Sequence, residues 1–261
     1  MRELRLRKRR APLAYLLMRP LAVSLIALLS IVDLVELQAA EPRFRPALIG
    51  NGPTALIDLI DTKKLMEKGQ RDGLLMFKCD VSRLGKAGNY MAYAETPGSK
   101  VLKEETGLAV WKSRFIPAIY NGERTDVIFA GTVVFVVKDG KPHLRIYANQ
   151  SRQDIERGND FIAPQVVANS PDWVGSRFNL VAQKARVYQQ NGAVKLSITV
   201  DANGNQRNLK VISEDPPGFG IGEDIRKMYD TAKWIPGFRN GKPVDCTFDY
   251  PEVFLTWRGL P

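Results

Sequence analysis

Apolar residues recur at every second position in segments 73–81 and 192–200, which lie 119 residues apart in the chain. Every second side chain is apolar, and the opposite face of the second segment carries Lys195, Ser197 and Thr199. This period of two predicts a half-buried strand in each place. A glycine turn follows each strand, and further strands at 89–95 and 208–214 complete a predicted hairpin.

The apolar spacing changes to that of a helix after Pro97 and after Pro216, and Pro117 and Pro236 end the helices. The expected inward faces are Val101, Leu108, Trp111 and Phe115 in the first helix, and Ile221, Ile225, Met228, Ala232 and Ile235 in the second. These faces differ by one residue in an ungapped alignment, which predicts a local slip. Last strands are expected at 126–137 and 245–254.

Segments 73–135 and 192–254 align without a gap, which predicts a duplicated unit. The clearest match is Arg114-Phe115-Ile116-Pro117 with Lys233-Trp234-Ile235-Pro236, and each is followed by an Asn-Gly turn. The predicted fold class is α+β: two tandem small two-layer domains, each strand-strand-helix-strand with an antiparallel sheet. Lead-in helices are expected at 62–70 and 178–189, and a hairpin joins 133–137 to 143–148. The expected domains are 55–149 and 176–257, separated by a linker at 150–175 with a short helix.

The formal net charge is +10, and residues 1–40 contribute seven Lys or Arg against three Asp or Glu. The rest of the chain has no basic run, which argues against nucleic acid as a partner. Basic residues precede the uncharged apolar stretch Leu21–Val32, which has the length of a secretory signal core. Two alternatives stay open: a signal peptide cleaved near Ala40, with an exported or periplasmic protein, or an uncleaved inner-membrane anchor facing the periplasm. Translation from Met18 instead of Met1 is a further open alternative.

The cysteines do not occupy corresponding positions of the two units, because Cys79 aligns with Ile198 and Cys246 with Val127. Each replaces an aliphatic residue of the other copy, which favours buried thiols in separate cores. A disulfide between the units is the alternative.

Few residues of the sequence suggest catalytic chemistry. His143, the single histidine, is expected at the surface, and no metal-ligand spacing or nucleotide-binding motif occurs. Gly218–Gly222 is expected to be a plain loop, with an anion site at the following helix as the alternative. Structural roles are expected for the recurring pairs Glu95/Glu214, Glu104/Glu223 and Asp126/Asp245, and core positions for Trp111, Phe115 and Trp234. We therefore expect no enzyme activity, no cofactor and no bound metal.

The order of elements, together with Lys233-Trp234-Ile235-Pro236 and Gly241-Lys242-Pro243-Val244, resembles the C-terminal domain of TonB. That family transmits inner-membrane energy to outer-membrane receptors. The first copy departs from the pattern with Gly122-Glu123-Arg124-Thr125. The segment 41–62 contains only three prolines, so it lacks the long Pro-rich span of TonB. The resemblance implies the fold of both units and a place in TonB-type outer-membrane transport.

The favoured hypothesis is a protein-interaction protein that adds a partner's peptide as a strand to an open sheet edge. The partner is expected to be an envelope protein or extended peptide, such as an outer-membrane receptor, with a homodimer as an alternative. Membrane contact is expected only through an uncleaved N-terminal segment. The expected partner-binding residues are Val127, Phe129, Gly131, Val133, Thr247, Asp249, Pro251 and Val253. The alternative is a structural envelope scaffold whose paired domains form one continuous sheet.

Overall fold

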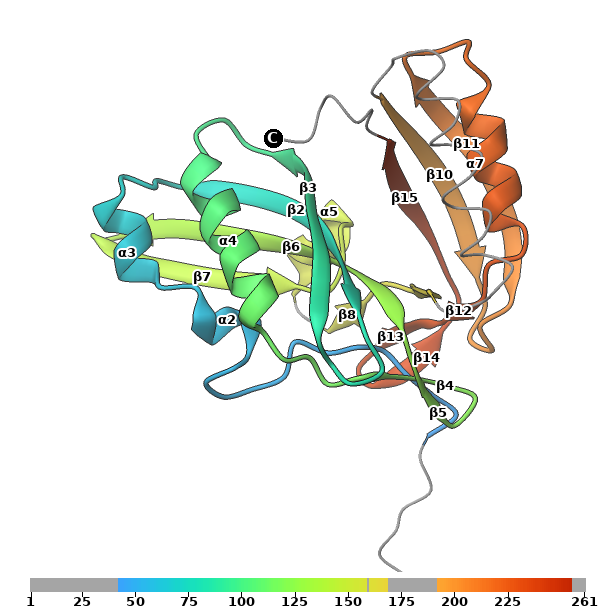
Figure 1. Cartoon of the computed structure of the whole chain (residues 1–261), viewed down its shortest axis with the longest axis horizontal. Coiled ribbons are helices and arrows are strands. Elements are labelled where there is room, and N and C mark those ends of the chain that lie inside the picture. The colour runs from blue at the N-terminus through green and yellow to red at the C-terminus, as the bar shows by residue number, and fades with distance from the viewer. Residues whose placement is uncertain (1–41, 159, 169–191, 255–261) are drawn as a thin grey trace, which may run out of the picture. The chain divides into compact units, whose positions relative to one another are not determined.

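The computed structural model describes residues 42–158, 160–168 and 192–254, which form a mixed α+β structure (Figure 1). The helices are α2 (Leu56–Leu59), α3 (Thr62–Glu67), α4 (Lys100–Lys112), α5 (Arg152–Arg157) and α7 (Ile221–Tyr229). The long strands are β2 (Gly73–Val81), β3 (Ala87–Glu95), β6 (Val127–Lys138), β7 (Lys141–Tyr147), β10 (Gly192–Val200), β11 (Gln206–Asp215) and β15 (Cys246–Phe254). The short strands are β1 (Phe44–Arg45), β4 (Ala118–Tyr120), β5 (Glu123–Thr125), β8 (Phe161–Ile162), β9 (Gln165–Val167), β12 (Trp234–Ile235), β13 (Gly237–Arg239) and β14 (Lys242–Val244).

Several sequence predictions fall outside these residues, namely the N-terminal segment and the second lead-in helix at 178–189. The first lead-in helix is confirmed as α3, and the predicted hairpin after the first unit is confirmed as β6 and β7. No helix in the described part of the chain is both long and apolar enough to cross a bilayer.

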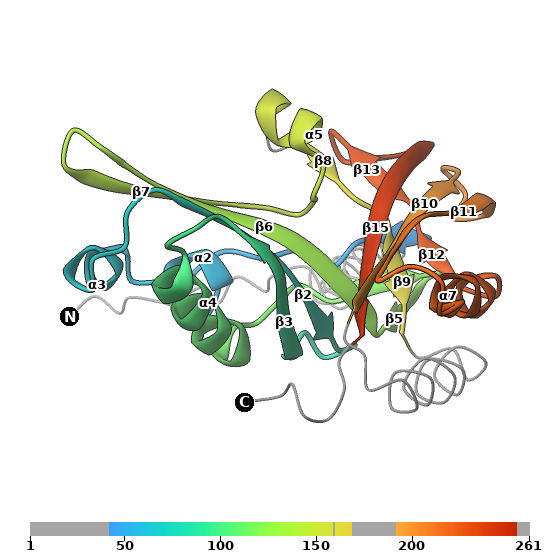
Figure 2. The ribbon, with the colours of Figure 1, turned by 90° about the horizontal axis from the view of Figure 1, so that it is seen from above.

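The first large sheet has the strand order β12-β9-β6-β2-β3, and β7 pairs with β6. The predicted inward face of β2 is buried: Leu75, Phe77, Cys79 and Val81 are at most 1% exposed. Helix α4 packs on β3 and β2 and closes this core with Leu102, Ala109 and Val110 (Figure 2). Alternating side chains on the strand and a helix face thus form the two-layer core that the pattern predicted.

A separate sheet has the order β11-β10-β15. Its central strand β10 buries Val194, Leu196, Ile198 and Val200, again as the alternation predicted. Helix α7 packs on β11 and β10, and its buried residues Ile221, Ile225 and Met228 belong to the same apolar cluster.

Corresponding strands of the two sheets pair in the same register. β2 pairs with β6 from Gly73–Phe135 to Val81–Val127, and β10 pairs with β15 from Gly192–Phe254 to Val200–Cys246, both without a register shift. Each residue pair of β2 and β6 therefore has its counterpart 119 residues later.

The buried faces of α4 and α7 also correspond at an offset of 119 residues, so the one-residue slip predicted for the helix alignment is wrong. The buried positions Leu102, Ala109 and Val110 of α4 correspond to the buried Ile221, Met228 and Tyr229 of α7. The predicted apolar face of the first helix is wrong at Leu108 and Trp111, which are 54% and 61% exposed, whereas Val101 packs against the core and Phe115 is buried. The inward face of α4 instead combines Leu102, Ala109 and Val110 with the buried polar residues Glu105 and Thr106.

Glu105 is one of these inward polar residues, and it is buried because it has local partners. Its carboxylate accepts hydrogen bonds from Lys64 at 2.9 Å and Lys68 at 2.6 Å, both from the α3 region. The hydrogen bonds from these ammonium groups lower the pKa of Glu105, which favours the charged form in its buried place. Apolar periodicity cannot detect a helix face whose polar residues are paired in this way.

The hairpin glycines are required by backbone geometry in both units. Gly85 and Gly204 have φ of +74° and +79°, and a Cβ on Gly204 would lie 2.5 Å from the carbonyl oxygen of Trp234. A Cβ on Gly85 would collide in the same way with the carbonyl of Phe115. Each hairpin therefore packs its turn directly against the chain that follows the helix.

The predicted linker contains the expected short helix, α5, and also contributes strands. β8 pairs with β13, while β9 pairs with β12 and with β6. The side chain of Gln165 in β9 binds both backbone groups of Ala47, accepting from its N–H at 2.7 Å and donating to its carbonyl at 3.0 Å. This segment is thus built into the sheets, which the polar composition of 151–175 did not indicate.

Candidate functional site at the edge of β15

β15 lies at one edge of its sheet, and within the described residues only β10 pairs with it. Its counterpart β6 pairs with β2 along one side, and with β9 at 127–128 and β7 at 132–138 on the other. The predicted partner-binding residues therefore have different settings. Val127 and Val133 have strand neighbours on both sides, Phe129 and Gly131 pair with β2, and Thr247, Asp249, Pro251 and Val253 lie on the edge strand.

Pro251 indicates which residues of β15 point their backbone N–H and C=O groups toward β10 and which point them away. Residues of an antiparallel strand point their N–H and C=O groups alternately toward and away from the neighbouring strand. Pro251 has no N–H to donate to β10, and its carbonyl accepts a hydrogen bond from Lys78 of the other sheet, which indicates that it points away from β10. Residues two positions apart share this direction, which gives Thr247 and Asp249 backbone groups directed at the free edge.

A cavity of about 410 Å³ adjoins this edge. Thr247 and Asp249 line it from β15, Lys195 from β10, Ala130 from β6, and residues 149–154 from the chain after β7. Lys195 and Asp249 form an ion pair at 2.6 Å on its wall. A strand added to β15 would thus have space beside it for side chains.

Lys78 of β2 closes one end of the edge. Its ammonium group lies 3.2 Å from a carboxylate oxygen of Glu252 and 3.6 Å from the ring centre of Tyr250. Tyr229 donates a hydrogen bond to the same carboxylate at 3.1 Å. The side chains of Lys78 and Glu252 are 4% and 9% exposed, so the pair is buried.

The sequence pattern did not identify Lys78, because it falls on the predicted polar face of its strand. A signal was nevertheless present in the alignment of the two units. Lys78 corresponds to Ser197 and Glu252 to Val133, so each charge occurs once and in a different copy. Charges present in only one copy are unnecessary for the shared fold.

The recurring carboxylates have structural partners, as predicted. Glu214 accepts a hydrogen bond at 3.0 Å from the N–H of Ile221, at the start of α7. This carboxylate occupies the N-terminus of α7, which begins within the predicted loop Gly218–Gly222, and this leaves the alternative of an anion site there unsupported. Glu95 lies 3.4 Å from Lys103, and Glu104 lies 4.0 Å from Lys100.

Asp126 and Asp245 take turn hydrogen bonds, and this prediction is confirmed. Each accepts a backbone N–H at 2.6 Å from the hairpin turn of its own unit, from Arg83 and Ala202 respectively. These donors also correspond in the alignment, so the two interactions are equivalent.

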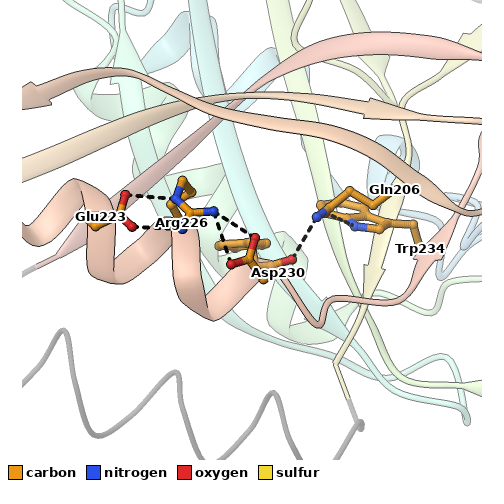
Figure 3. A network of polar contacts seen from close by, with 6 residues as sticks. Gln206, Glu223, Arg226, Asp230 and Trp234 are labelled. Carbon is orange, nitrogen blue, oxygen red and sulfur yellow. Dashed lines mark hydrogen bonds and ion pairs between the residues drawn. The ribbon is translucent and has the colours of Figure 1, made fainter.

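Several polar groups around α7 bind one another (Figure 3). The indole of the buried Trp234 donates to Gln206 at 2.9 Å, and Gln206 donates to the carbonyl of Tyr229 at 3.2 Å. Arg226 bridges Glu223 at 2.8 Å and Asp230 at 3.0 Å along the surface of the helix. Core positions are thus confirmed for Trp234 and also for Phe115, which is 4% exposed, whereas the core position predicted for Trp111 is wrong.

Cys79 and Cys246 are free thiols; Cys79 is buried, as predicted, and Cys246 is half-buried. Burial raises the pKa of Cys79, and burial raises that of Cys246 to about 11, so both remain protonated at neutral pH. His143 is exposed, as predicted. Among the residues that the structure describes, no group of His, Cys, Asp and Glu could hold a metal ion.

Residues 182–255 match the family model described as the Gram-negative bacterial TonB protein C-terminal. The match identifies one such domain, and the model does not detect a second one in the first unit. No curated protein and no solved structure matches the chain. The family is typically non-enzymatic, and it implies a periplasm-facing location in the cell envelope and interaction with outer-membrane receptors. It suggests a TonB-type energy-transduction or transport-related role.

Proposed function

We propose that this chain is a non-enzymatic, exported envelope protein that binds an extended peptide segment of a partner protein at the edge of β15. The partner segment would pair with the outward backbone groups of Thr247 and Asp249 and direct side chains into the adjoining cavity. The observation that carries this proposal is the contrast between two equivalent strands. The edge of β6 is covered by β9 at 127–128 and by β7 at 132–138, whereas β15 has no second strand neighbour among the described residues.

We also propose that residues 55–149 form a second domain of the same type, which arose by duplication and diverged. The support is the common register and the common helix faces at a constant offset of 119 residues. Because the edge of β6 is covered, this domain has a supporting role, in which Lys78 contacts β15.

The partner class follows from the family match, whose members interact with outer-membrane receptors. An extended segment of such a receptor has the backbone groups that an edge strand requires. The chain would then act in TonB-type transport across the outer membrane.

The alternative of a structural scaffold requires one continuous sheet without a free edge. In the described residues β11, β10 and β15 form a sheet of their own, and only the short β12 joins the first sheet. This observation favours the interaction function over the scaffold.

The proposal is tested by removing one outward N–H group from the edge. Asp249→Pro deletes this donor, and Pro251 indicates that proline is compatible with this phase of the strand. Asp249→Ala is the matched control, because it removes the same carboxylate and keeps the N–H. The readout is photo-crosslinking from position 247 in intact cell envelopes.

The expected result is a set of crosslinked proteins that includes an outer-membrane receptor, retained in Asp249→Ala and lost in Asp249→Pro. Circular dichroism should show both variants folded. Crosslinks that persist in Asp249→Pro, or that contain only a second copy of this chain, would contradict the proposal.

A further inference from the structure

The outer surface of the first unit carries large apolar side chains that its fold does not use. Leu108 and Trp111 of α4 are 54% and 61% exposed, and Leu84 in the turn between β2 and β3 is 70% exposed. Cationic residues accompany them, and Arg83, Lys86, Lys112 and Arg114 are all exposed. We call these seven residues the basic-apolar surface.

The parts of the basic-apolar surface are neighbours in space. Trp111 lies over β3, since a Cβ on Gly88 would be 3.5 Å from its ring. Lys86 and Arg114 form an antiparallel bridge, which brings the hairpin turn beside the end of α4. Leu108 lies one helical turn before Trp111.

The second unit shows that the shared fold does not require these residues. At the positions of Leu84, Leu108 and Trp111 it has Asn203, Lys227 and Asp230, all of them exposed and polar. Asp230 even forms an ion pair with Arg226 (Figure 3). The hairpins pair alike beside the turn, at Val81–Ala87 and Val200–Gln206, and differ by one residue at Asp80–Gly88 and Thr199–Asn208. The exposed apolar residues belong to the first unit alone.

The charges on the basic-apolar surface are available to a ligand. Among the described residues, none of its cationic side chains forms an ion pair or a side-chain hydrogen bond. The nearest acidic residue on the outward face of α4 is Glu104, which pairs with Lys100 at 4.0 Å. The surface therefore combines an indole, leucines and unpaired cations.

We infer that the basic-apolar surface rests on an anionic phospholipid membrane. Tryptophan and leucine enter the interface between headgroups and acyl chains, while lysine and arginine are attracted to anionic headgroups. The unpaired cations supply the charge complementarity that selects this occupant. The inference is independent of the proposed function, which concerns β15.

The test measures the position of Trp111 directly, so that membrane binding by another part of the chain does not affect it. The full-length protein is mixed with vesicles that contain brominated phospholipids, which quench tryptophan fluorescence at contact. One vesicle type is phosphatidylcholine, and the other is an equimolar mixture with phosphatidylglycerol. Trp111→Phe keeps the surface apolar, and the quenching lost in this variant is the contribution of Trp111.

We expect quenching of Trp111 with the anionic vesicles and none with phosphatidylcholine alone. Lys86→Gln combined with Arg114→Gln should lower the apparent vesicle affinity about tenfold or more, because each removed cation weakens headgroup attraction. The matched control is Lys138→Gln with Lys141→Gln, exposed lysines of the β6–β7 hairpin, which should leave the quenching unchanged.

Three results would overturn the inference. The first is an absence of Trp111 quenching with anionic vesicles, and the second is equal quenching with both vesicle types. The third is a concentration-dependent dimer in sedimentation that Trp111→Asp abolishes, since a second copy would then cover the surface.

Discussion

Replacing Lys78 by methionine should destabilise the protein strongly, because Lys78 is half of a buried ion pair. Its ammonium lies 3.2 Å from the Glu252 carboxylate, and the two side chains are 4% and 9% exposed. Removing one partner of such a pair typically costs about 3–5 kcal/mol, since the other charge stays in a poorly solvated place. The contact with the Tyr250 ring adds about 0.5–2 kcal/mol to the loss.

The double variant Lys78→Met/Glu252→Gln separates two contributions to the loss of stability. One is the lost interaction between the two side chains, and the other is the charge of Glu252 that stays buried without Lys78. The double variant removes both charges of the pair, and glutamine retains an oxygen that can accept the hydrogen bond from Tyr229. We therefore expect its free energy of unfolding to recover to within about 1 kcal/mol of the parent. The coupling energy of the double-mutant cycle should exceed about 2 kcal/mol.

The assay is urea unfolding followed by circular dichroism for the parent, both single variants and the double variant. A loss below about 1 kcal/mol in Lys78→Met would show that solvent reaches the pair. Additive single effects would also refute the reasoning, because they would mean that the two charges do not interact.

Other predictions concern the turns and the thiols. Gly204→Ala should cost more than about 2 kcal/mol in urea unfolding, because φ is +79° and the new Cβ would lie 2.5 Å from the Trp234 carbonyl oxygen. Burial would raise the pKa of Asp201, but hydrogen bonds from Asn205 and neighbouring donors lower it to about 2. The Asp201 carboxylate therefore stabilises the fold above pH 4, and this stabilisation is lost as pH falls through about 2. Asp201→Asn should make the free energy of unfolding depend less on pH in this range. Folding raises the pKa of Cys246 from 9 to about 11, so its contribution to stability is present below pH 9 and is lost as pH rises through 11. In a separate experiment, mass spectrometry should find Cys246 alkylated before the buried Cys79.

The sequence predicted the strands well because their apolar period is local. Leu75, Phe77 and Val81 alternate toward the core, and the alignment carried the same prediction to β10. The glycine turns followed from backbone geometry, since Gly85 and Gly204 adopt positive φ. Such features depend on neighbours in the chain and can be inferred without a structure.

The errors arose where tertiary contacts reversed a local pattern. Periodicity assigned Trp111 to the core, yet Glu105 faces inward because Lys64 and Lys68 neutralise it. Segment 161–167 looked like linker, yet its strands pair with β13, β12 and β6. Only the fold brings these partners together from distant parts of the chain, so local spacing carried no signal for them.

The edge of β15 is open in the described residues, but it is protected against unselective pairing. Exposed strand edges promote aggregation unless charges, prolines or covering segments blunt them. β15 has such features: Pro251 lacks an N–H, Lys78 occupies its carbonyl, and Asp249 places a carboxylate in an ion pair beside the edge. In the proposed function, the donors left at Thr247 and Asp249 would pair with a short partner segment, whose affinity would come partly from side chains in the adjoining cavity. A short backbone contact combined with a shaped cavity makes binding depend on the partner's sequence, which distinguishes a recognition site from an edge that any strand could extend.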